Sequence, residues 1–106
     1  MNLRLDSKSI RVRVSHQEAL QLAKEGMLSE WLPLAGKRLE LRLQCQEGKL
    51  LFVESPSAEC VAIHIPLVKL HSMLTMKEVE MRNVLHDGLN PIEIRFEIDR
   101  FTLKNQ

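Results

Sequence analysis

Apolar and polar residues alternate along several short stretches of this chain, which is the pattern of a strand with one buried face. The alternation runs through residues 2–6, 10–14, 38–45 and 92–98. Because a short polar turn separates the first two stretches, we predict that they pair as a hairpin. The stretch 38–45 is the most regular, with every second residue apolar and only charged or amide residues between.

A helix is predicted over residues 16–25. Ser15 and Glu18 have the spacing of a capping box, in which each side chain accepts a hydrogen bond from the other residue's backbone amide. Gly26 is a natural stop, since glycine readily adopts the left-handed conformation found at helix ends. Residues 27–37 keep neither period and contain a proline and a glycine, so we interpret them as a connecting loop.

The second half of the chain repeats these signals in a similar order. A turn at residues 47–48 predicts that the strand 38–45 pairs with a second strand over residues 49–54. An alternating strand over residues 60–65 then runs into a second helix, whose first turn can hold Pro66 because proline lacks only an amide that is unpaired there. That helix carries leucines at helical spacing, namely Leu67, Leu70 and Leu74.

Taken in order, the predicted elements are strand, strand, helix, strand, then the same four again and one further strand. We therefore predict an α+β fold of about seven mainly antiparallel strands and two short helices. The order favours a duplicated unit, with pseudo-repeat halves 1–48 and 49–106 in a single domain, 1–106. It would form a sheet with helices on one face or a small, partly closed barrel. Residues 77–83 alternate like a strand, with a continuing helix as the alternative.

The composition is that of one soluble domain, because 44 % of the 106 residues are hydrophobic, 27 % are charged and the net charge is +1. A charge so near zero argues against a strongly basic nucleic-acid binder. Cys45 and Cys60 lie inside strand-like runs, where we expect buried free thiols. The charged amino-terminal residues and the lack of a long apolar run predict a cytoplasmic protein with no membrane partner.

The first 26 residues resemble the opening of a family of small bacterial proteins of unknown function. The resemblance rests on Leu3-Arg4-Leu5, on Ser9-Ile10-Arg11-Val12-Arg13-Val14-Ser15, and on a short helix ending in Lys24-Glu25-Gly26. The later order of elements, with a strand ending in Ile63-His64-Ile65-Pro66, is similar too. The resemblance implies a bacterial protein, and it implies no activity and no catalytic residues.

A weaker similarity lies in the topology. A strand-strand-helix-strand unit with serine or proline at the strand-to-helix join looks like the swapped-hairpin fold of AbrB-like transcription factors and related duplicated barrels. That resemblance implies DNA binding through basic residues on paired hairpins. The present chain has Lys8-Ser9 where that group usually has a Gly-Arg turn.

Arg4, Arg11 and Arg13 are predicted to share the outward face of the first hairpin, because residues of one parity on paired strands point to the same side. Guanidinium groups bind oxyanions at two points, so this basic patch is a candidate site for phosphate, nucleic acid or an acidic partner. The alternative is a solvated face whose arginines are balanced by Glu93 and Glu97 on another strand.

Trp31 is a candidate anchor for a partner, since tryptophan is enriched at interaction hot spots, and a lid over the core is its alternative role. His71 falls on the apolar stripe of the second helix, so we expect it to be partly buried. Cys60 and His64 share a strand face but lie roughly 13 Å apart along it, too far for one ion. We predict no metal site, no cofactor site and no catalytic residue, because neither a phosphate loop nor a nucleophile-base pattern is present.

We therefore expect a small cytoplasmic interaction module without catalytic activity, which self-associates as a homodimer or docks another protein. Pairing between copies is one common way of covering exposed sheet edges. Nucleic-acid binding through the basic first hairpin is the alternative function. A small-molecule-binding protein or an enzyme is a second alternative.

Overall fold

The computed structural model describes residues 1–75, 78, 80–87 and 90–99 of the chain. This part of the chain forms eight strands and two helices. In chain order they are β1 (Asn2–Leu5), β2 (Ser9–Val14), α1 (His16–Glu25), β3 (Met27–Leu34), β4 (Lys37–Gln46), β5 (Phe52–Ser57), β6 (Cys60–Pro66), α2 (Leu67–Leu74), β7 (Glu80–Asp87) and β8 (Asn90–Ile98).

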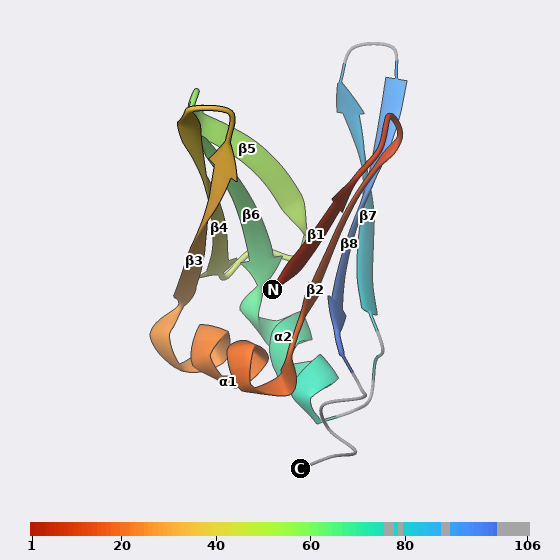
Figure 1. The fold of residues 1–106 in the computed structure, drawn as a ribbon. Coiled ribbons are helices and arrows are strands. Elements are labelled where there is room, and N and C mark those ends of the chain that lie inside the picture. The colour runs from red at the N-terminus through yellow and green to blue at the C-terminus, as the bar shows by residue number, and fades with distance from the viewer. Residues whose placement is uncertain (76–77, 79, 88–89, 100–106) are drawn as a thin grey trace.

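The strands form two four-stranded sheets, each built from one hairpin of either half of the chain. Sheet A has the order β1-β2-β8-β7, and sheet B has the order β3-β4-β6-β5. In both sheets the two central strands run parallel and the outer pairs run antiparallel. Both helices lie at one end of the two sheets, opposite the tips of the hairpins (Figure 1). The fold is therefore α+β, as predicted, but it has eight strands in two sheets instead of about seven in a partly closed barrel.

The first helix begins and ends where the sequence predicts. The Ser15 hydroxyl accepts from the Glu18 amide, and the Glu18 carboxylate accepts from the Ser15 amide. Gly26 has a φ of 81° and donates its amide to the Leu22 carbonyl at 2.8 Å, which ends the helix. In α2, Pro66 precedes the first helical residue. At this position the missing proline amide costs no helical hydrogen bond, because the first amides of a helix have no intrahelical partner.

The prediction that residues 27–37 form a loop is wrong, because Met27–Leu34 is the edge strand β3, paired antiparallel with β4. Apolar side chains occupy both of its faces, with Leu28 packed on the core and Trp31 on the outer side, so no alternation marks it. The turn to β4 is tight and uses Gly36 at a φ of 82°, where a side chain would be strained.

The predicted hairpin between residues 38–45 and 49–54 is also wrong. β4 pairs with β3 and, in parallel, with β6, whereas β5 pairs only with β6. The turn residues Glu47 and Gly48 indicate only that the chain bends, not which strand comes to lie beside β4. Here they lie in the connection between β4 and β5, and this connection buries Leu51 in the core. The strand interpretation of residues 77–83 holds from Glu80 onward, where β7 begins; positions 76, 77 and 79 lie outside the described residues.

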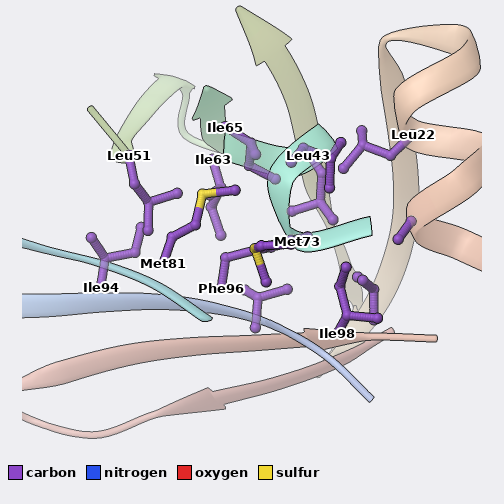
Figure 2. Packing of buried hydrophobic residues seen from close by; sticks show 14 of the residues in the cluster. Leu22, Leu43, Leu51, Ile63, Ile65, Met73, Met81, Ile94, Phe96 and Ile98 are labelled. Carbon is purple, nitrogen blue, oxygen red and sulfur yellow. The ribbon is translucent and has the colours of Figure 1, made fainter. Parts of the chain in front are cut away.

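A single hydrophobic core fills the space between the two sheets and the helices. Figure 2 shows side chains from the inner faces of both sheets and from both helices meeting there. The fully or almost fully buried members include Leu22, Leu43, Ile63, Ile65, Met73, Met81, Ile94 and Phe96. These side chains come from all parts of the chain. Each sheet therefore buries its inner face only by packing against the other sheet and the helices.

Each sheet has one parallel pair of strands at its centre, and in both sheets this pair brings inward-facing apolar residues opposite each other. Val12 lies opposite Phe96 where β2 meets β8, and Leu43 lies opposite Ile63 where β4 meets β6. The element order of the first half, two strands, a helix and two strands, recurs in the second half. Each half therefore contributes one outer and one central strand to both sheets.

Candidate functional site

Four arginines lie in one row across the outer face of sheet A. Arg4 is opposite Arg11, Arg11 is level with Arg95 in the parallel strand, and Arg95 is opposite Arg82. We call this set, Arg4, Arg11, Arg95 and Arg82, the arginine row. Neighbouring strands are about 4.8 Å apart, so the row spans roughly 14 Å. Arg13 belongs to the next row, opposite Asn2 and level with Glu97.

The structure thus places the three predicted arginines on one face and adds two that sequence reasoning missed. Arg82 and Arg95 each alternate with apolar residues, which assigns them to an outer face. Nothing in the local pattern indicates that this face is shared with the first hairpin. That depends on the parallel pairing of β2 with β8, whose residues lie more than eighty positions apart.

Carboxylates beside the row hold most of these guanidinium groups. Arg11 binds Glu97 at two points, with Nε to Oε1 at 2.8 Å and Nη2 to Oε2 at 3.2 Å. The same carboxylate also accepts from Arg13 at 3.3 Å. Two further pairs lie within single strands, Arg82 with Glu80 and Arg95 with Glu93. The balancing role expected of Glu93 and Glu97 is therefore present in the structure.

These contacts shift the protonation equilibria of the Arg11–Glu97 pair. The hydrogen bond to Glu97 and its negative charge raise the pKa of Arg11 above its ordinary value. Burial by itself would raise the pKa of Glu97, but hydrogen bonds from Arg11 and Arg13 and their charges outweigh it, so the pKa is lowered. Both groups are therefore charged at neutral pH.

Arg11, Arg13 and Arg82 are more exposed than the carboxylates that hold them, whereas Arg95 is no more exposed than Glu93. The side chain of Glu97 is 13 % exposed, whereas those of Arg11 and Arg13 are 33 % and 44 % exposed. Arg82 is likewise more exposed than Glu80. Arg4 is exposed, and no hydrogen bond or ion pair to it occurs in the described part of the chain. Forked donors are thus accessible to solvent on this face.

A shallow concavity of about 290 Å³ opens at the hairpin end of the row. Asp6 lies at its rim and accepts hydrogen bonds from the backbone amides of Lys8 and Ser9 and from the Ser9 hydroxyl. These bonds lower the pKa of Asp6, and they make this carboxylate part of the turn. The full lining is Arg4, Asp6, Ser9, Arg11, Glu93 and Arg95.

The outer face of sheet B has a different character, with apolar side chains on its edge strand β3. Trp31 lies opposite Glu40 and is 52 % exposed, and Met27 on the same strand is 49 % exposed. The Arg38 guanidinium carbon lies 5.5 Å from the centre of the Trp31 ring, a cation–π distance. Trp31 is therefore a surface residue and not a lid over the core.

A histidine and two cysteines also lie on sheet B. His64 is buried, stacks on Phe52 with ring centres 4.3 Å apart, and has its Nε2 2.6 Å from the Glu54 carboxylate. Cys45 and Cys60 are unpaired thiols. Burial raises the pKa of both, and for Cys60 the nearby Glu40 adds to the increase.

His71 is exposed, not partly buried as predicted, because on α2 the core contacts come from Leu70 and Met73. Across residues 1–75, 78, 80–87 and 90–99, no three His, Cys, Asp or Glu side chains come together as a metal site. Nor does any helix in these ranges have the length and apolar character that a membrane span requires.

Comparison with protein families gives a match over almost the whole chain. The family is described as a family of unknown function (DUF7009), and it matches residues 1–105. This agrees with the resemblance predicted from the first 26 residues. No curated protein and no solved structure matches the chain.

Proposed function

We propose that this chain, which belongs to the DUF7009 family of unknown function, is a small interaction module that self-associates through the edge strand β3. The observation that carries this proposal is a half-exposed tryptophan, Trp31, on a long strand with one edge that no strand in the described part of the chain covers. The unpaired Cys45 and Cys60 suit the reducing cytoplasm, where we place the protein.

The four edge strands of the two sheets differ in how well they are protected. An exposed edge presents unpaired backbone groups that can pair with another chain, and short length, proline and bulges are the usual protection. β1 has only four residues, and β5 contains Pro56 and a register shift. β3 and β7 each have eight residues; β3 contains Pro33, but this proline is next to the last residue, so residues 27–32 are uninterrupted. The long edges are therefore the candidates for strand addition.

Of these two edges, β3 has the surface that suits a protein partner. Protein interfaces are depleted of charge at their centre and enriched in tryptophan and methionine. The outer side of β3 presents Met27 and Trp31, whereas that of β7 presents the charged pair Glu80 and Arg82 beside a half-exposed Val84. This difference favours β3.

A second copy of the chain is the partner that this edge fits best. Two identical strands can pair antiparallel about a two-fold axis, which uses both free edges and closes the assembly. Pairing of β3 with β7 of another copy would instead leave one free edge at each end and lead to open chains of molecules. We therefore propose a dimer joined at β3.

Light scattering after size-exclusion chromatography, over micromolar to near-millimolar concentrations, tests this proposal. We expect a mass of twice 12.3 kDa that falls to the monomer value on dilution. Trp31→Ala should move the transition to at least tenfold higher concentration, because hot-spot truncations cost about 2 kcal/mol or more. Val68→Ala is the matched control, since Val68 is 76 % exposed on α2. A monomer at every concentration, or equal effects of both variants, would overturn the proposal.

A further inference from the structure

The outer face of sheet A is almost entirely polar and charged, and it faces away from the core that joins the two sheets (Figure 1). We infer that this face binds the phosphate backbone of double-stranded DNA through the arginine row, without reading base sequence. This inference concerns the sheet that does not contain β3, so it stands independently of the proposed dimer.

The spacing of the arginine row fits a phosphate backbone. The row places four arginine positions side by side over roughly 14 Å, one on each strand of the sheet. Phosphates of one DNA strand rise by about 3.4 Å along the helix axis and, because the strand winds, lie about 7 Å apart through space, so the row can face about three of them. Arginine suits this target because its fork of donors matches a phosphate at two points.

Several guanidinium donors of the arginine row remain free to bind an anion. A guanidinium group has five N–H donors. Arg11 uses its Nε and Nη2 for Glu97, while Arg82 uses its Nε for Glu80. Each arginine therefore keeps donors that no described residue occupies, and Arg4 keeps all of its own. Carboxylates beside the guanidinium groups of Arg11, Arg82 and Arg95 hold these side chains in place, which reduces the entropy lost when an anion binds.

The chemistry of this face favours double-stranded DNA over other classes of partner. A protein interface needs an apolar centre with little charge, and arginines and glutamates fill the middle of this face. Protein–DNA interfaces are instead polar and positively charged. Single-stranded nucleic acid is commonly held by stacking on aromatic rings. No Phe, Tyr or Trp occurs on the outer side of the described parts of β1, β2, β7 and β8, which favours a duplex.

Charge balance limits the strength of this binding. The row and Arg13 contribute five positive charges, and Glu80, Glu93 and Glu97 contribute three negative ones. The face is therefore only moderately positive, and its attraction to DNA should be weak at high salt. Phosphate contacts alone carry no sequence information, so affinity should not depend on base sequence.

A fluorescence-anisotropy titration with a labelled 20-base-pair duplex, using the full chain at several salt concentrations, tests the inference. About three phosphate contacts give a slope of log affinity against log salt near −2.7, so affinity should fall about 40-fold between 50 and 200 mM salt. Arg4→Gln with Arg82→Gln should reduce this slope by about 2. Both side chains are well exposed, so the fold should not change, and equal urea midpoints would verify this.

A matched control removes the same charge elsewhere. Lys37 and Lys49 are exposed and lie outside sheet A, and Lys37→Gln with Lys49→Gln should leave the slope unchanged. A second variant, Arg4→Lys with Arg82→Lys, keeps the charge and should keep the slope while weakening affinity, because lysine lacks the fork.

Several results would overturn the inference. These are no binding at 50 mM salt, equal loss in the control and row variants, and tighter binding of a single strand than of the duplex. Displacement of the duplex by polyglutamate at equal charge would assign the face to an acidic protein. Binding to phosphatidylserine vesicles but not to DNA, with the same sensitivity to the variants, would assign it to a membrane surface. Retention of the duplex in the presence of polyglutamate would support the phosphate assignment.

Discussion

Arg11 in β2 and Glu97 in β8, 86 residues apart in the chain, form a two-point ion pair across the parallel junction of sheet A. The pair joins a hairpin of the first half of the chain to a hairpin of the second. Because Glu97 also accepts a hydrogen bond from Arg13, one carboxylate holds two arginines on the outer face of sheet A. Its protonation should therefore affect both stability and the geometry of that face.

Stability should depend on pH through Glu97. Its pKa in the folded protein is lowered below the ordinary 4.5. A lowered carboxyl pKa adds stability that is complete above the unfolded-state value and is lost as the pH falls through the folded-state pKa. Urea unfolding between pH 7 and pH 3 should show a smaller loss of stability for Glu97→Gln than for the unchanged protein.

The comparison isolates Glu97, because Glu18 and Glu40, whose pKa values are also lowered, are present in both proteins. Parallel pH profiles for the two proteins would contradict this prediction. A difference that appears only above pH 5 would contradict it as well, since the sign of the shift places the effect at lower pH.

The junction between β4 and β6 should be sensitive to loss of volume. Leu43 is fully buried and lies opposite Ile63 in the core. Leu43→Ala should lower the free energy of unfolding by about 3 kcal/mol, since it removes buried methyl groups and leaves a cavity. Leu50→Ala, at a position 62 % exposed, is the control and should change stability by less than about 0.5 kcal/mol. Equal urea midpoints for the two variants would contradict the packing described for this junction.

The cap of α1 should contribute measurably to stability. Ser15→Ala removes the acceptor for the Glu18 amide and should cost about 1 kcal/mol in urea unfolding. Ser7→Ala, in the exposed turn between β1 and β2, should be nearly neutral. A Ser15 variant as stable as the unchanged protein would show that the helix start is satisfied without its cap.

Trp31 is the single tryptophan of the chain and can report on association directly. Its half-exposed ring should emit at long wavelength in the monomer and at shorter wavelength once a second copy covers it. We expect the emission maximum to shift over the same concentration range as the mass. A mass that doubles while the emission stays constant would place the dimer interface away from Trp31.

Several local features were predictable from the sequence, because neighbouring residues determine them. The box of Ser15 and Glu18 and the stop at Gly26 define α1 through backbone hydrogen bonds within a few residues. Alternation likewise located β2, β4, β6 and β8 and assigned Arg11 and Arg13 to an outer face. Such patterns state which side of a strand is buried, whatever strand lies beside it.

Beyond the hairpin of β1 and β2, which the sequence predicted, the tertiary structure alone decided which strands are neighbours. The apolar residues on both faces of β3 left it without a period, and the parallel junctions of β2 with β8 and of β4 with β6 join residues distant in the chain. Those junctions form because the inner faces of both sheets must be buried together. They also place Arg95 and Arg82 in line with Arg4 and Arg11, so the sequence determined the arginines and their outward direction, and only long-range burial of the core made them one row.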